Sequence, residues 1–290
     1  MRIYFFGDIH GNEYALDACI KHSQSIKADQ IYCLGDIVGW LPFGDRTLTR
    51  MKTYGFSTVA GNHDLLVAGL FTDFPQNLDR IQASAYNAGL LSTVPGSIDY
   101  LLSLPLTIEK DNFIIVHHSP FHLPSKGDPP TIRCFEYLTR PVLDSCLEAW
   151  NAYPKHIIFS GHDHIPVVYE LPGGVAPAIP EHVKVHKPSA GRKLTVRLNP
   201  HSRYWVKAGS VGGPYRDGVP AANAVLYDTT EETITLFRLP FPTERLYREL
   251  GSHFFAPTLP TMRDYLALLA KHLPPDATDG GDPVDPRGRT

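Results

Sequence analysis

Metal-binding side chains recur in five short segments of this chain, and each segment directly follows a run of apolar residues that favour β-strands. The candidate ligands are Asp8, His10, Asp36, Asn62, His117, His162 and His164. Carboxylate oxygens, imidazole nitrogens and amide oxygens are ligands that borderline divalent ions accept together. One histidine alone is more often a core or surface residue, but such a role does not account for all five segments. The sequence therefore predicts a hydrolytic centre that binds two divalent ions.

The spacing of these residues predicts how they divide between the two ions. Asp8 and His10 are separated by one residue, so on an extended strand end their side chains point to the same side and bind one ion, which His164 completes. We expect Asp36 to bridge the ions, because a carboxylate can place an oxygen on each of two ions about 4 Å apart. The ligands expected at the second ion are Asn62, His117 and His162.

Two ions held in this way predict a reaction as well as a site. They would lower the pKa of a shared water, so that a metal-bridging hydroxide attacks a phosphate ester. His63, next to a ligand in the sequence, is predicted to donate a proton to the leaving oxygen as general acid. Asp64 either orients His63 or caps a helix that begins near Leu65.

The elements that must position these side chains follow from the hydrophobic pattern. Short apolar runs predict buried strands at residues 3–6, 30–34, 57–60, 113–116 and 156–159. Amphipathic spacing predicts helices at residues 13–25, 45–54, 78–91, 141–150 and 261–272. Further strands are expected at residues 167–171, 193–198, 204–208, 224–227 and 233–239. Strands alternate with helices and then follow one another, which predicts an α/β fold with a second sheet packed on the first.

We expect one domain over residues 1–272 and a disordered tail at 273–290, which is poor in apolar residues. A Gly/Pro-rich insertion is expected at about residues 172–203. Between residues 184 and 207 the chain has no acidic side chain, and the basic ones are Lys184, Lys187, Arg192, Lys193, Arg197, Arg203 and Lys207. This basic run is either a solvated hairpin or a lid that meets a phosphorylated substrate.

Composition limits the partners and the compartment. The 290 residues carry a net charge of -3, so overall charge does not favour nucleic acid or an anionic membrane. Long nucleic acid is disfavoured because it needs an extended basic surface with stacking aromatic side chains. The four cysteines are scattered and are expected to be reduced thiols. No apolar stretch has the length of a signal peptide or a membrane span, so we expect a soluble, cytoplasmic protein.

The five segments resemble the motifs of the calcineurin-like metallophosphoesterase superfamily, in order, over about residues 1–240. The matching motifs are Asp8-x-His10, Gly35-Asp36-x-x-Gly39, Gly61-Asn62-His63-Asp64, His117 and Gly161-His162-x-His164. The resemblance implies a four-layer α/β sandwich, with two mixed β-sheets flanked by helices and a dinuclear metal site at the strand ends. It also implies Mn, Ni, Fe or Zn ions and the hydrolysis of phosphate esters.

A narrower resemblance is to the bacterial and archaeal predicted phosphodiesterases of this superfamily. It rests on residues 6–12, on Ala208-Gly209-Ser210-Val211-Gly212 and on Arg216-Asp217-Gly218. Protein phosphatases and dinucleotide tetraphosphate hydrolases carry an Asp-Arg pair where this chain has Gly39-Trp40, which disfavours those two functions. Trp40, Pro42 and Phe43 form either an apolar substrate wall or local packing.

Two polar residues are candidates for substrate binding. His118 stands where the superfamily commonly has Gly, so we take His117 as the ligand and expect His118 to face the substrate. Arg216 follows a Gly-rich turn and either contacts phosphate through its planar guanidinium or is exposed to solvent.

The sequence favours a metal-dependent phosphodiesterase that acts on a small phosphoester, with a nucleotide among the candidates. One alternative is a phosphomonoesterase or nucleotide phosphatase that uses the same site. The other is a non-catalytic metal-binding scaffold, like a retromer subunit that resembles the family but has lost the catalytic histidine. His63 is present in this chain, which argues against the scaffold. The natural substrate, the native metal and the oligomeric state do not follow from the sequence.

Overall fold

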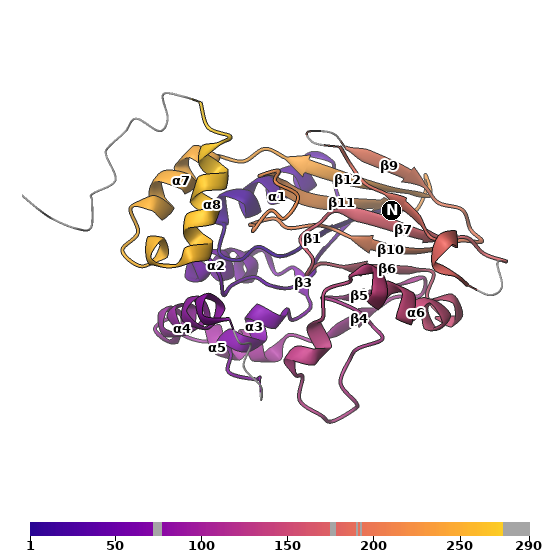
Figure 1. Ribbon diagram of the computed structural model, residues 1–290, viewed down its shortest axis with the longest axis horizontal. Coiled ribbons are helices and arrows are strands. Elements are labelled where there is room, and N and C mark those ends of the chain that lie inside the picture. The colour runs from indigo at the N-terminus through magenta and orange to yellow at the C-terminus, as the bar shows by residue number, and fades with distance from the viewer. Residues whose placement is uncertain (72–76, 175–177, 190, 192, 275–290) are drawn as a thin grey trace, which may run out of the picture.

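Two mixed six-stranded sheets form the centre of the computed structural model, which describes residues 1–71, 77–174, 178–189, 191 and 193–274 (Figure 1). The first sheet has the order β3 (Ser57–Thr58), β2 (Gln30–Cys33), β1 (Arg2–Phe6), β11 (Ala222–Asp228), β12 (Thr233–Leu239) and β9 (Leu194–Arg197). The second has the order β4 (Thr107–Glu109), β5 (Phe113–Val116), β6 (Ile157–Ser160), β10 (Arg203–Lys207), β7 (Val167–Leu171) and β8 (Lys184–His186). Strands β1, β2 and β3 are parallel, as are β5, β6 and β10.

Alternating side chains of β1 show how the layers form. Ile3 and Phe5 point into a core shared by the two sheets, where the rings of Phe5 and Phe159 stack at 3.8 Å between centroids. Tyr4 and Phe6 point the other way, into a core formed with helices. Because successive strand side chains face opposite sides of a sheet, one strand contributes to both cores.

Helices cover the outer faces of both sheets and complete the four-layer α/β sandwich that the sequence predicts. The helices of the first core are α1 (Glu13–Ser25), α2 (Gly44–Tyr54), α4 (Leu78–Ser92), α5 (Ser97–Ser103), α7 (Thr243–Gly251) and α8 (Pro260–Ala270). Helix α6 (Arg140–Ala152) covers the second sheet, where Trp150 packs against Trp205. Short α3 (Asn62–Val67) contacts α4 and α5 beside the sheets (Figure 1). Within the described residues, no helix combines the length and apolar character needed to cross a lipid bilayer.

Most of the helices predicted from the sequence begin and end within two residues of the observed bounds. Helices α5 and α7 were not predicted. The described part of the chain also has three short 3₁₀ helices, at Ile132–Phe135, Pro180–His182 and Ala256–Thr258.

The basic segment predicted as an insertion holds two edge strands. Strand β8 pairs with β7 in the second sheet, and β9 pairs with β12 in the first. On β8, Lys184 and His186 lie 3.3 Å and 3.0 Å from the carboxylate of Glu170. Residues 175–177, 190 and 192 of this segment and residues 275–290 of the expected tail lie outside the described residues.

Candidate active site

All seven predicted metal ligands are buried and lie together. Asp8 and His10 follow β1, Asp36 follows β2, His117 follows β5, His162 and His164 follow β6, and Asn62 begins α3. The carboxyl ends of the parallel strands therefore bring the motifs to one place. Two groups of side chains there could each hold an ion: Asp8, His10 and His164, and Asp36, His117 and His162.

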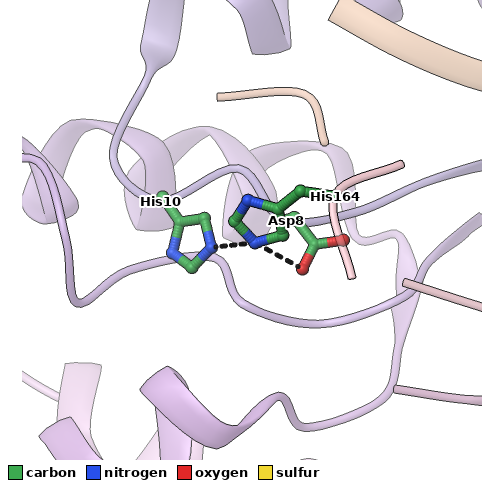
Figure 2. A group of neighbouring side chains, drawn as sticks. All are labelled: Asp8, His10 and His164. Atoms are coloured by element: carbon green, nitrogen blue, oxygen red, sulfur yellow. Dashed lines mark hydrogen bonds and ion pairs between the residues drawn. The ribbon is translucent and has the colours of Figure 1, made fainter. Parts of the chain in front are cut away.

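The first group is compact and directed inward (Figure 2). The Nε2 atoms of His10 and His164 are 3.1 Å apart, and His164 Nε2 is 3.4 Å from Asp8 Oδ1. His10 Nε2 also lies 3.5 Å from Asp36 Oδ2. Two imidazole nitrogens and carboxylate oxygens that converge in this way form a donor set suited to a divalent cation.

The second group combines an amide oxygen with two imidazoles. Asn62 Oδ1 lies 3.1 Å from His117 Nε2 and 2.9 Å from His162 Nδ1. His117 Nε2 is 3.3 Å from Asp36 Oδ2. This donor set also suits a divalent cation, and the neutral amide limits the negative charge at the site.

Asp36 connects the two groups through one oxygen. Its Oδ1 accepts a hydrogen bond from the backbone N–H of His63 at 2.8 Å. Its Oδ2 faces both His10 of the first group and His117 of the second. The sequence predicted a carboxylate with one oxygen for each ion, whereas the geometry offers the single atom Oδ2 to both.

Backbone carbonyl groups orient three of the four histidines. Each carbonyl can only accept, so the ring nitrogen facing it carries the proton and the other ring nitrogen keeps its lone pair for a metal. The pairs are His117 Nδ1 with the oxygen of Leu34 at 2.6 Å, His162 Nε2 with that of Phe135 at 2.9 Å, and His164 Nδ1 with that of Pro214 at 2.9 Å.

The backbone at the ligands is conformationally unusual. Five of the seven ligands have positive φ angles: Asp8, His10, Asp36, His162 and His164. Residues other than Gly rarely adopt this conformation, and it is concentrated at functional sites. Two glycines allow close approach: a Cβ on Gly61 would lie 2.1 Å from Asp36 Oδ1, and one on Gly161 would lie 2.4 Å from Asp8 Oδ2.

Burial and charge shift the pKa values of the ligands in different directions. Burial lowers the pKa of His10 and of His162 well below the usual imidazole value. Burial also acts to lower the pKa of His117, but the carboxylate of Asp36 outweighs it and raises that pKa to about 9. His117 therefore holds a proton near pH 7 when no ion is bound, and a metal ion must displace this proton.

His63 lies at the edge of the cluster, where it lines a cavity. Its Nδ1 donates to the carbonyl oxygen of Gly39 at 3.2 Å. Burial, together with the positive charge of Arg80, lowers the pKa of His63 to about 4, although Asp36 opposes this shift. His63 is also close enough to His10 and Asp36 for these three side chains to hold an ion together.

Asp64 takes part in the cap of a helix, but from its third residue, because α3 begins at Asn62 and not near Leu65. Its carboxylate accepts hydrogen bonds from the backbone N–H groups of Gly61 at 3.0 Å and Ile37 at 2.8 Å. It thereby caps α3 and fixes the loop after β2. Burial, and then the nearby charge of Asp36, raises the pKa of Asp64 to about 7.

His118 does not face the substrate as the sequence analysis expected. It is buried outside the lining of the cavity, with its ring centroid 5.6 Å from that of His122 and 5.3 Å from that of His162. The physical reason is the strand geometry, because neighbouring side chains at a strand end point to opposite sides. Burial, with the charge of Lys207, lowers the pKa of His118 to about 2.

The cavity beside the cluster has a volume of about 330 Å³. Arg216 lines it with an exposed side chain, so its contact with phosphate stays a prediction. Trp40 also lines the cavity, whereas Phe43 packs locally against Arg46 and His253. Within the described residues, none of the lining side chains comes from residues 172–207.

Sequence reasoning missed several lining residues. Arg80 and Tyr137 lie on α4 and on the loop before α6, and no local motif marks them. One face of α8 supplies Thr261, Asp264, Tyr265 and Leu268. Their spacing is that of a single helix face. The sequence could therefore predict that these residues share one surface, but not that this surface lines the cavity.

Asp163, between His162 and His164, makes two polar contacts. Its Oδ2 lies 2.6 Å from the ammonium of Lys207, which is 2% exposed, and its Oδ1 accepts from the backbone N–H of Leu138 at 2.9 Å. The pair fixes the loop between His162 and His164.

We expect Asp163→Asn to lower the free energy of unfolding by about 3 to 5 kcal/mol, because it leaves a buried ammonium without an anionic partner. Urea denaturation measures this change. The matched control is Asp144→Asn, which breaks the exposed 2.8 Å pair with Arg140 and should cost less than about 1 kcal/mol. Equal losses in the two variants would show that the Lys207 pair contributes little.

A buried cluster of histidines and carboxylates at the strand ends of a two-sheet α/β sandwich defines a metal-dependent hydrolase. The family model of the calcineurin-like phosphoesterases matches residues 1–166. This match covers more than half of the chain, and the protein therefore belongs to that family. It is a hydrolase that acts on phosphoester bonds, and its His and Asp groups are suited to the divalent metals that the family typically binds.

Two relatives agree with this assignment. An uncharacterized protein of Methanocaldococcus jannaschii is 28% identical over 255 residues, which cover 86% of this chain and 91% of that protein. The crystal structure of a metallophosphoesterase from Sphaerobacter thermophilus is similar, with a TM-score of 0.69 and 25% identity. That similarity covers 94% of this chain and all of the other.

Proposed function

We propose that this protein is a phosphodiesterase with two divalent ions, which hydrolyses small phosphodiesters in the cavity beside the metal ligands. The observation that carries the proposal is the position of Asp36 Oδ2, which faces two separate ligand groups at the base of a cavity lined by His63. A shared carboxylate oxygen between two imidazole-rich groups is typical of a two-metal hydrolytic site.

Each part of the cluster has a task in this reaction. When bound, the ions would act as Lewis acids: they would neutralise charge on the phosphate and lower the pKa of water, so that hydroxide is available to attack the phosphate. The carbonyl-bonded histidines direct their other ring nitrogens toward the proposed cations, and that of His117 gives up its proton when a cation binds. His63 lies on the cavity side of the cluster and, when protonated, gives its Nε2 proton to the leaving oxygen.

The walls of the cavity favour a diester over a monoester. Trp40, Tyr137 and Tyr265 provide aromatic surface beside the metal ligands, which suits ester groups on both sides of a phosphate. A cavity of about 330 Å³ matches a small ligand of nucleotide size.

The test compares the hydrolysis of bis-p-nitrophenyl phosphate with that of p-nitrophenyl phosphate, in the presence of Mn, Ni, Mg or a chelator. We expect kcat/KM to be at least about tenfold higher for the diester, a difference of about 1.4 kcal/mol in activation free energy. Activity should disappear in the chelator and return with Mn. A preference for the monoester would support a phosphatase instead, and metal-loaded protein that cleaves neither compound would support a binding scaffold.

A further inference from the structure

Two arginines converge on one phenol oxygen inside the cavity. Arg80 Nη2 lies 3.2 Å and Arg216 Nη2 lies 2.5 Å from the hydroxyl oxygen of Tyr137. The guanidinium carbon of Arg216 is also 4.0 Å from the centroid of the Tyr137 ring. Arg80 begins α4, whereas Arg216 lies on the loop before β11, so the fold brings together two cations that are far apart in the sequence.

Neither guanidinium has a carboxylate within ion-pair distance among the residues that the structure describes. Arg46, by contrast, lies 2.8 Å from Glu13 and 2.6 Å from Glu249. A guanidinium has five N–H donors, and one phenol oxygen satisfies few of those on two arginines. Most of these donors are therefore available to an anion, and guanidinium groups bind phosphate oxygens with well-defined geometry.

The arginine pair lies next to the metal ligands without being part of them. The ring of Tyr137 stacks on that of His162 at 4.8 Å between centroids, with an interplanar angle of 18°. Tyr137 thus separates the second ligand group from the guanidinium groups. An anion bound to Arg80 and Arg216 would be a neighbour of the phosphate at the metals.

Acidic groups line the same cavity as the arginines. The backbone N–H of Thr261 on α8 donates to Asp79 Oδ2 at 2.9 Å, which ties α8 to the start of α4. Asp79, the residue before Arg80, and Asp264 carry negative charge, so they repel an anion and leave the guanidinium groups as its binding partners. The cavity volume of about 330 Å³ leaves space for more than one phosphate group.

We propose that Arg80 and Arg216 form a second anion site beside the metal centre. The substrates would then be small phosphodiesters that carry another phosphate group, such as a dinucleotide with a terminal phosphate. The statement about substrates rests on the proposed function, because it assumes that the ester at the metal centre is the one cleaved. In that case Arg80 contributes to substrate specificity by binding the second phosphate group.

Calorimetry can test this site without any turnover. The ligands are thymidine 3′,5′-bisphosphate and thymidine 5′-monophosphate, titrated into the Mn-loaded full chain. We expect the wild-type protein to bind the bisphosphate at least about 30-fold more tightly. Arg80→Gln and Arg216→Gln should each reduce this advantage about tenfold, with less than about a threefold change for the monophosphate. The control is Arg140→Gln on α6, which should keep the full preference.

Three results would overturn the anion site. They are a wild-type protein without preference for the bisphosphate, variants that keep the preference, and variants that lose affinity for both ligands equally. The last result would assign the arginines to the phosphate at the metals. Melting curves of both variants show whether the fold is intact, and the double variant gives a second measure of the preference. Calorimetry measures binding and not turnover. If the protein fails to hydrolyse the diester, the proposed function is rejected, but the binding result for the anion site remains valid.

Discussion

Asp36→Asn is expected to lower kcat/KM for the diester by at least about 1,000-fold, or about 4 kcal/mol in activation free energy. In the wild-type protein, Oδ1 accepts from the His63 backbone at 2.8 Å and Oδ2 faces His10 and His117. An asparagine cannot satisfy both sides. If its oxygen stays with the backbone N–H, its NH₂ group points at the ions. If it flips, two donors face each other and the backbone N–H loses its acceptor.

Metal content measured beside activity identifies the cause of the loss. We expect Asp36→Asn to bind fewer than two ions per chain, and wild-type protein to bind two. Asp99→Asn, an exposed change of the same type on α5, should alter neither metal content nor kcat/KM. A variant at Asp36 that is fully active with two ions bound would reject the bridging role of Oδ2.

The candidate metal ligands could be proposed from the sequence because each follows a local rule. Asp8, Asp36 and His117 directly follow apolar strands, and parallel strands end at the same edge of a sheet. Two of the glycines that mark the motifs also have a physical reason in the structure. Any side chain at Gly61 or Gly161 would meet a metal-binding carboxylate.

The remaining parts of the site could not be predicted, because they depend on tertiary packing. Arg80 and Tyr137 become neighbours only when α4 packs near the loop that precedes α6. Asp163 looks like a turn residue until β10 places Lys207 beside it. His118 is the reverse case. Its position next to His117 suggested that it faces the substrate, but the strand geometry turns its side chain away from the cavity.

The hydrogen bond from His63 to Gly39 restricts the proton transfer that His63 can perform. A carbonyl oxygen only accepts, so Nδ1 carries the proton of the neutral ring and Nε2 has none to donate. His63 is therefore a general acid only as the imidazolium. Burial, with the charge of Arg80, lowers its pKa to about 4, so the imidazolium fraction falls about tenfold for each pH unit above that value. A bound phosphate would raise this pKa, because its negative charge stabilises the cation, and bound divalent ions would lower it.

His63→Ala should consequently lower kcat by about 100- to 10,000-fold for a diester with a nucleoside leaving group, which must be protonated as it departs. The effect on bis-p-nitrophenyl phosphate should be much smaller, because p-nitrophenolate leaves without a proton. The part of the rate that depends on His63 should decline as the pH rises above its pKa in the complex. His201→Ala, an exposed change, serves as the control. Equal losses on both diesters with both ions retained would make His63 a phosphate-binding group, and loss of an ion would make it a ligand, as its position near His10 and Asp36 permits.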